Sequence, residues 1–126
     1  MRYYVVTVFE ELVRDFCGQA LLGKAQESGR VTVETVSPRE FATDRHRSID
    51  DTPYGGGSGM VMMPGPVVEA MERAEARELE RGGERPWRVL LTPQGEPFRQ
   101  SHARELAGRG ALTLVCGRYE GVDERA

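Results

Sequence analysis

Tyr3-Tyr4-Val5-Val6-Thr7-Val8 opens the chain with aromatic and β-branched residues and no polar alternation. Such a run predicts a strand that is buried on both faces, as strands of parallel sheets are. Further apolar runs predict buried strands at 31–36, 89–91 and 112–116. Helical spacing of apolar residues predicts helices at 10–17, 21–27, 64–81 and 100–107. Strands that alternate with helices indicate an α/β fold, with a mostly parallel sheet and flanking helices.

Glycines and one proline set the ends of these predicted helices. Gly18 and Gly108 end two of them, and Pro64 suits the first turn of a third. The helix over 64–81 has an apolar face made of Val67, Val68, Met71, Ala74 and Leu79. Its charged residues are expected to form a solvated face, made of Glu69, Glu72, Arg73, Arg77, Glu78 and Glu80.

Length and charge exclude several classes of protein. The chain has 126 residues, which suits one domain, and 20 acidic against 17 basic residues give a net charge of −3. This balance excludes a strongly basic nucleic-acid module but leaves room for a local basic patch.

No apolar run approaches the ~20 residues of a transmembrane helix. The first apolar run, Tyr3 to Phe9, is too short for a signal peptide and precedes Glu10 and Glu11. We therefore expect a cytoplasmic protein without a membrane partner.

Three segments with unusual composition follow predicted strands, namely 37–59, 92–97 and 117–121. The first of them shows neither helical nor strand periodicity over 23 residues, and stretches of this length are usually functional or disordered. In parallel sheets, ligands bind outside the carboxyl ends of the strands. The three segments are therefore the candidate site.

The glycine-rich stretch Tyr54-Gly55-Gly56-Gly57-Ser58-Gly59 fits none of the common phosphate or nucleophile motifs. A Walker A loop needs a lysine that is missing here, and Met60 breaks both GxGxxG and GxSxG. Two interpretations remain open: a loop whose bare backbone lets another molecule approach, or a plain flexible loop. Asp50 and Asp51 could accept hydrogen bonds from base edges or be solvated. Gly117–Gly121 suits a ligand with a stackable ring, or forms a sharp turn.

Other candidate residues carry weaker signals. A small basic cluster that could contact phosphate is formed by Arg39, Arg45, His46 and Arg47. His46 and His102 have no partner at ligand or triad spacing, so neither is expected to be catalytic, and no metal site is predicted. Cys17 and Cys116 are isolated and are interpreted as buried thiols.

The candidate segments together contain a series of longer motifs: Pro38-Arg39-Glu40-Phe41, Asp44-Arg45-His46-Arg47, Asp50-Asp51, Pro53-Tyr54-Gly55-Gly56-Gly57, Gly59-Met60, Pro93-Gln94-Gly95 and Cys116-Gly117-Arg118-Tyr119-Glu120-Gly121-Val122-Asp123-Glu124-Arg125. In this order they resemble the bacterial tRNA (guanine-N1)-methyltransferases of the knotted SPOUT class, and the likeness runs over residues 1–126. The chain departs from the family's usual residues at Glu10, Thr52 and Ser58.

The resemblance implies a trefoil-knot methyltransferase domain and an obligate homodimer. It implies methyl transfer from S-adenosylmethionine to N1 of guanosine 37 of tRNA, next to the anticodon. The implied cofactor residues are Leu91, Thr92, Pro93, Gly117, Tyr119, Glu120 and Gly121. The implied residues that meet the target guanosine and its neighbour are Asp50, Tyr54, Gly55 and Gly59.

By the same resemblance, residues 1–126 are the N-terminal part of the methyltransferase domain. The family's third cofactor loop, its catalytic aspartate and a C-terminal tRNA-binding domain would follow Ala126, so this chain alone is expected to be inactive. Leu91 and Val115 would be exposed without that continuation. Two alternatives stay open: a folded piece that dimerises or touches RNA without catalysis, and a nucleotide-binding α/β domain.

Overall fold

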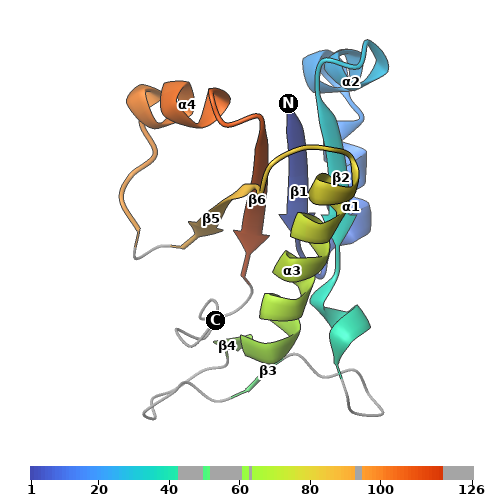
Figure 1. The fold of residues 1–126 in the computed structure, drawn as a ribbon, viewed down its shortest axis with the longest axis vertical. Helices are drawn as coiled ribbons and strands as arrows, with labels where there is room; N and C mark the ends of the chain where they lie inside the picture. The colour runs from blue at the N-terminus through green and yellow to red at the C-terminus, as the bar shows by residue number, and fades with distance from the viewer. Residues whose placement is uncertain (43–49, 52–60, 63, 93–94, 118–126) are drawn as a thin grey trace.

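The computed structural model describes residues 1–42, 50–51, 61–62, 64–92 and 95–117 (Figure 1). Its centre is a four-stranded parallel sheet in the order β2-β1-β6-β5. These strands are β1 Arg2–Val6, β2 Thr32–Val36, β5 Trp87–Leu91 and β6 Ala111–Cys116. The predicted α/β fold with a parallel sheet is confirmed. Parallel sheets bind ligands outside the carboxyl ends of their strands.

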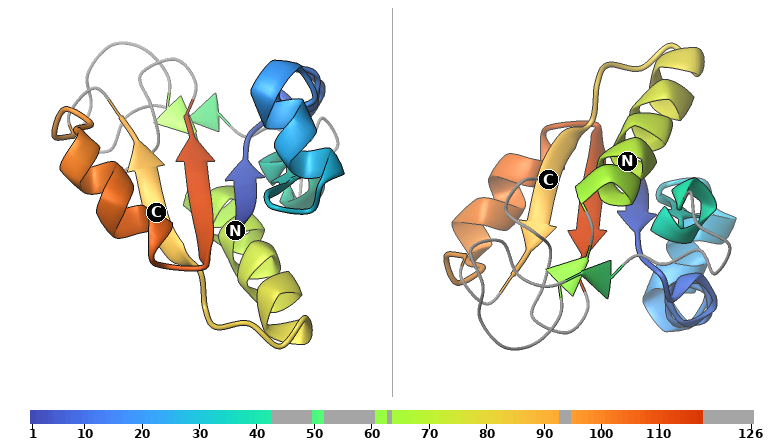
Figure 2. Two further views of the ribbon diagram at one scale, coloured as in Figure 1. Left: turned by 90° about the horizontal axis from the view of Figure 1, so that it is seen from above. Right: turned by 90° about the horizontal axis from the view of Figure 1, so that it is seen from below.

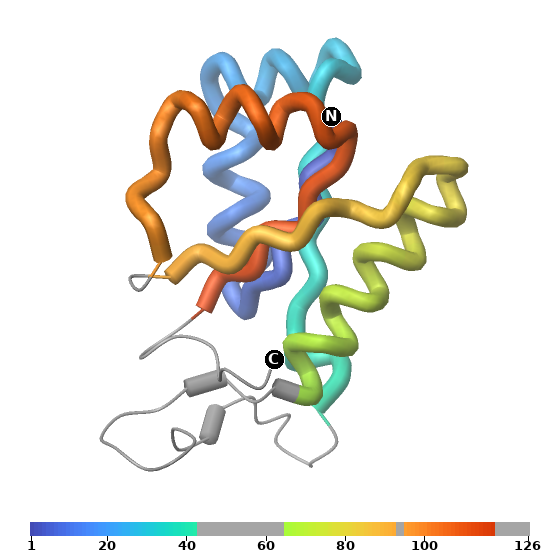
Figure 3. Tube along the Cα trace, turned by 60° about the vertical axis from the view of Figure 1, so that its left-hand side comes forward, coloured from blue at the N-terminus to red at the C-terminus, as the bar shows by residue number. Residues whose placement is uncertain are grey.

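Helices cover both faces of this sheet (Figure 3). One face packs against α3, Pro64–Glu80, whose Val67, Ala70 and Ala74 are completely buried. Their partners in the sheet include Tyr4 and Val115, which belong to the same buried cluster. The opposite face carries α1, Glu10–Cys17, and α2, Ala20–Glu27, beside β2, and α4, Gln100–Ala107, toward β5.

Two short elements lead from the sheet toward α3. A 3-10 turn, η1 Pro38–Phe41, begins where Ser37 Oγ accepts a hydrogen bond from the Arg39 amide. The strands β3, Asp50–Asp51, and β4, Val61–Met62, form a two-residue antiparallel ladder. This ladder lies at the carboxyl ends of the parallel strands (Figure 2). It pairs Asp51 with Val61 and Asp50 with Met62.

The structure corrects four expectations about burial. β5 was expected to be buried, but among the described residues it pairs only with β6 and forms an edge of the sheet. Leu91 is 51% exposed, as expected for residues 1–126 alone. Glu78 was expected on a solvated face, yet it is only 2% exposed. It follows Ala74 by four residues, so it lies on the apolar face of α3, whereas the expected core residue Leu79 points outward and is exposed. Val115, expected to be exposed, is buried under α3.

Glu78 is buried because its carboxylate is fully engaged. Arg2 donates through Nε and Nη2 at 2.6 Å each, and the Tyr4 hydroxyl donates to Oε1 at 2.7 Å. Arg81 in turn donates to the Tyr4 hydroxyl at 2.9 Å and to Glu34. The hydrogen bonds from Arg2, followed by that from Tyr4, lower the pKa of Glu78 below its usual value, against the opposing effect of desolvation. The carboxylate therefore stays ionised inside the fold.

Candidate functional site

The predicted site residues that the structure describes meet at the carboxyl end of the sheet. β5 and β6 pair with Leu91 opposite Cys116, so Thr92 and Gly117 leave the sheet next to each other. Asp50 lies in β3, where it pairs with Met62 at the same end (Figure 2). Three segments that are far apart in the sequence thus converge, as the strand-end rule predicts.

The remaining predicted residues lie outside the described part of the chain. These are Pro93, Tyr119, Glu120 and Gly121 among the cofactor residues, and Tyr54, Gly55 and Gly59 among the RNA residues. The basic-cluster residues Arg45 and Arg47, together with His46, lie outside it as well.

A tight turn follows β5. The Gly95 amide donates to the Thr92 carbonyl at 3.2 Å, which closes the segment after Leu91. A Cβ on Gly95 would lie 3.3 Å from Thr92 Cγ2, so a side chain at this position would press against Thr92. The half-exposed Leu91 side chain and the bare backbone of Gly117 thus stand side by side. An apolar surface next to accessible backbone amides and carbonyls suits a flat heteroaromatic ring.

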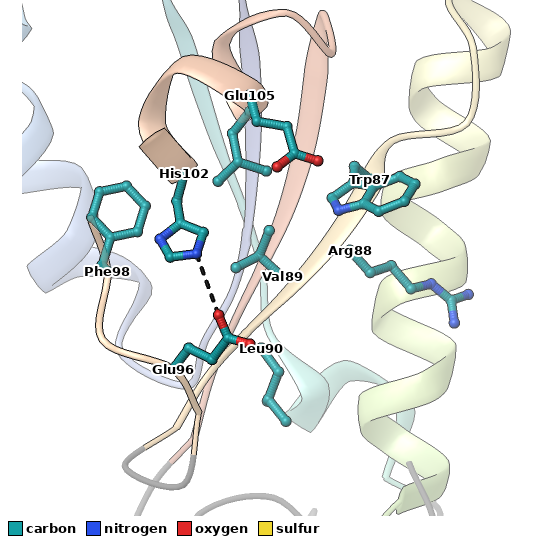
Figure 4. Close-up of a pocket in the computed structure, with 9 residues that line it drawn as sticks. Trp87, Arg88, Val89, Leu90, Glu96, Phe98, His102 and Glu105 are labelled. Carbon is teal, nitrogen blue, oxygen red and sulfur yellow. Dashed lines mark ion pairs between the residues drawn. The ribbon is translucent and has the colours of Figure 1, made fainter. Parts of the chain in front are cut away.

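Two cavities border β5. One, of about 330 Å³, lies between α4 and the sheet and is walled by apolar side chains, including Leu91, Leu106 and Leu114. The other, of about 370 Å³, lies along the edge of β5 and is lined by Trp87 and Leu90 on one side and by Phe98 and His102 on the other (Figure 4).

His102 is a residue that the sequence prediction missed. Its Nδ1 accepts a hydrogen bond from the Arg99 amide at 3.0 Å, and its Nε2 lies 3.4 Å from Glu96 Oε2. Its ring stacks on Phe98 with the ring centres 6.0 Å apart (Figure 4). The third residue of a helix can cap the helix when its side chain accepts a hydrogen bond from the backbone amide of the residue that precedes the helix. His102 does this for Arg99. The spacing of Arg99 and His102 could have signalled it.

The Cys116 thiol, at the end of β6, is poorly suited to act as a nucleophile. Burial raises the pKa of the Cys116 thiol, which is half-buried, so it stays protonated and poorly nucleophilic at neutral pH. Within the described ranges, no group of three or more His, Cys, Asp or Glu side chains is placed to hold a metal ion. None of the described helices is long and apolar enough to cross a membrane.

Comparison with known proteins assigns this arrangement to a family. The sequence model of the family described as tRNA (Guanine-1)-methyltransferase TrmD matches residues 1–126. The chain belongs to this methyltransferase family. The tRNA (guanine-N(1)-)-methyltransferase of Sorangium cellulosum is 51% identical over 99% of this chain and 53% of its own length. That of Thermus thermophilus is 51% identical over 99% of this chain and 49% of its own length.

The fold agrees with this family. The crystal structure of tRNA (m1G37) methyltransferase from Aquifex aeolicus matches with a TM-score of 0.80 and 34% sequence identity, over 99% of this chain and 54% of that one. The fold is thus that of a SPOUT methyltransferase. The chain spans about half the length of the TrmD relatives named here.

Proposed function

We propose that residues 1–126 form the N-terminal part of a methyltransferase domain that transfers a methyl group to N1 of guanosine 37 in tRNA. The observation that carries this proposal is the 51% identity with two proteins named tRNA (guanine-N(1)-)-methyltransferase, over 99% of this chain. The convergence of β3 with the ends of β5 and β6 supports it, because an RNA-contact segment and two cofactor segments would then share one site. We place this activity in the cytoplasm.

The proposed methyl donor is S-adenosylmethionine, and the residues present fit its adenosine portion. Leu91 offers apolar contact area for the adenine ring, and Gly117 leaves the backbone open on the neighbouring strand end. The hydrogen bond from the Gly95 amide to the Thr92 carbonyl ties these two residues together beside Leu91. When bound, the cofactor supplies an electrophilic methyl group on a sulfonium.

The residues of this chain would mainly position the two reactants. Methyl transfer needs the nitrogen in line with the methyl group, which is a gain in proximity and orientation. The ladder of β3 and β4 holds Asp50 at the sheet end, where its carboxylate would accept hydrogen bonds from a base beside the target. N1 of guanine also carries a proton that a general base must remove. We assign this base to an aspartate outside residues 1–126.

We further propose a homodimer, with α1 in the contact. Leu12 and Phe16 lie one helical turn apart on α1 and are 68% and 75% exposed, and Leu21 on α2 is 81% exposed. Apolar side chains of this size rarely gather on the surface of a monomer. The native mass of the full-length protein tests this: Phe16→Glu should convert dimer to monomer, whereas the nearby exposed Asp15→Asn should leave it a dimer.

Transfer of labelled methyl from S-adenosylmethionine to a tRNA transcript tests the activity. The full-length protein should methylate a transcript with guanosine 37 and leave one with adenosine 37 unmodified. The 126-residue chain alone should show no turnover, because it lacks the proposed base. A full-length protein that dimerises or binds tRNA but never transfers methyl would contradict the proposal and favour a non-catalytic role.

Two variants separate the proposed subsites in the full-length protein. Gly117→Val should abolish cofactor binding in calorimetry, since its side chain would enter the space of the adenine. Asp50→Ala should reduce methylation more than cofactor binding, by ~1–3 kcal/mol, the value of one good base contact. Unchanged cofactor affinity in a folded Gly117→Val protein would remove Gly117 from the site. An equal loss of both properties in Asp50→Ala would assign that residue to folding.

A further inference from the structure

The four residues Glu96–Arg99 join the turn after β5 to helix α4. The Gly95–Thr92 hydrogen bond closes that turn, which begins at the proposed cofactor residue Thr92. Three of the four connecting residues contact one side chain, His102, on the first turn of α4 (Figure 4).

A single protonation state of His102 satisfies both of its polar contacts. The Arg99 amide can only donate, so Nδ1 must carry a free lone pair, and the carboxylate of Glu96 can only accept, so Nε2 must carry the hydrogen. This is the neutral Nε2–H tautomer, inferred from the partners of the ring.

The three contacts differ in strength. Glu96 is 87% exposed in its side chain and sits 3.4 Å away, so solvent screens that pair. Phe98 is 73% exposed, and its stacking covers little area. The Arg99 amide, in contrast, lies just before α4, where helix geometry provides no backbone acceptor for it. The bond to Nδ1 is therefore the main anchor.

We infer that His102 is a positioning residue that fixes the path of Glu96–Arg99, and thereby the point at which the chain leaves the proposed cofactor turn. The inference rests on the proposed function, which assigns cofactor binding to that turn. His102 itself is not proposed to touch a reacting atom. Without the anchor, the chain after Gly95 samples more conformations, and a bound cofactor must restrict them again. That ordering cost lowers affinity for the cofactor and leaves the RNA segment around Asp50 unaffected.

The experiment uses the full-length protein and three variants. His102→Ala removes the anchor, and His102→Gln restores it, because a glutamine at this position of a helix can reach back to the same amide. Ser101→Ala, at the neighbouring exposed position of α4, is the matched control. Calorimetry with S-adenosylmethionine and the separate KM values for cofactor and tRNA are measured for each.

His102→Ala should weaken cofactor binding about three- to tenfold, the scale of ordering a short segment. The KM for tRNA should stay the same, and His102→Gln and Ser101→Ala should resemble the wild type. Amide hydrogen exchange without cofactor gives a second readout: exchange at Gly95 should accelerate in His102→Ala and recover in His102→Gln.

Several results would overturn the inference. They are wild-type affinity in His102→Ala, unchanged exchange at Gly95, or equal damage in His102→Gln and His102→Ala. These failures leave the proposed function intact, provided that the wild type binds the cofactor. A wild-type protein that binds none would refute the proposed function, and the inference with it.

Discussion

The two faces of the sheet are built from the same strands but are covered very differently. On the α3 face, Tyr4, Val36 and Val115 are almost completely buried under a 17-residue helix. On the opposite face, an eight-residue helix, α4, leaves a cavity of about 330 Å³ above the sheet, and Leu91 is 51% exposed.

This difference separates stability from binding. The α3 face holds the continuous core and the buried Arg2–Glu78 pair, so substitutions there act on the free energy of unfolding. The α4 face holds Leu91 and the cavity of about 330 Å³, so it exposes apolar surface that a ligand or another part of a longer chain could cover. His102 lies beside this face, at the second cavity along the edge of β5. The predictions below test this division.

Glu78→Ala should have the largest effect, a loss of about 2–4 kcal/mol in the free energy of unfolding. It leaves the buried Tyr4 hydroxyl without its acceptor and Arg2 without its partner, and the part-exposed Arg2 recovers some solvation. Urea unfolding of Glu78→Ala and of the exposed control Glu72→Ala measures the difference. The free energy of unfolding of Glu72→Ala should stay within ~0.5 kcal/mol of the wild-type value. Equal losses would refute the role of the buried pair.

Low pH should lower the free energy of unfolding through Glu78 on the α3 face. The pKa of Glu78 is lower in the folded chain than in the unfolded chain, mainly through the hydrogen bonds from Arg2. The unfolded state therefore takes up this proton first, and the contribution of Glu78 is lost as the pH falls below about 4 toward the folded pKa. Unfolding free energies measured over this range should fall more steeply for the wild type than for Glu78→Gln. If the unfolding free energies of the wild type and of Glu78→Gln fell in parallel with pH, Glu78 would not be the source of this acid sensitivity.

Local sequence patterns predicted the elements well. Helices α1 and α4 have the predicted bounds, since Gly18 and Gly108 follow clear helical spacing. The continuous apolar runs located the parallel strands to within about two residues. The strand order and the exposure of β5 depend on contacts between distant segments, which a local pattern does not contain. Glu78 was misplaced because its charge was weighted above its four-residue spacing from Ala74.

The candidate site was also predicted only in part, because some of its contacts join segments that are distant in the sequence. The rule on strand ends brings Leu91, Thr92 and Gly117 together, as the pairing of β5 with β6 shows. The ladder through Asp50 involves only two residue pairs and gives no periodic signal. His102 was set aside for lack of a triad or metal partner, whereas its contacts are a backbone amide and a stacked ring.

Val115 and Leu91 allow a direct comparison of the faces, because they are apolar residues near the ends of neighbouring strands. Val115→Ala should cost about 1–3 kcal/mol of stability, since it leaves a cavity in a closed core. Leu91→Ala should cost less than about 1 kcal/mol, because its side chain is half in water already, and yet it should weaken cofactor binding in the full-length protein. Thermal unfolding and calorimetry measure both. A larger loss of stability in Leu91→Ala than in Val115→Ala would contradict the assignment of stability to the α3 face and binding to the α4 face.

The smallest expected effect is a gain in stability from filling the cavity under α4. Ala103 lines it, and a leucine there would add apolar contacts with Leu112 and Leu114. Alanine and leucine have similar helix propensities, so the backbone of α4 contributes little to the change. We expect Ala103→Leu to stabilise the chain by about 0.5–1 kcal/mol, the usual range for cavity filling. Ala76→Leu, at an exposed position of α3, controls for the leucine itself and should be neutral in urea unfolding. If Ala103→Leu destabilises the chain instead, α4 already fits closely against the sheet, and the two faces differ in exposure but not in packing.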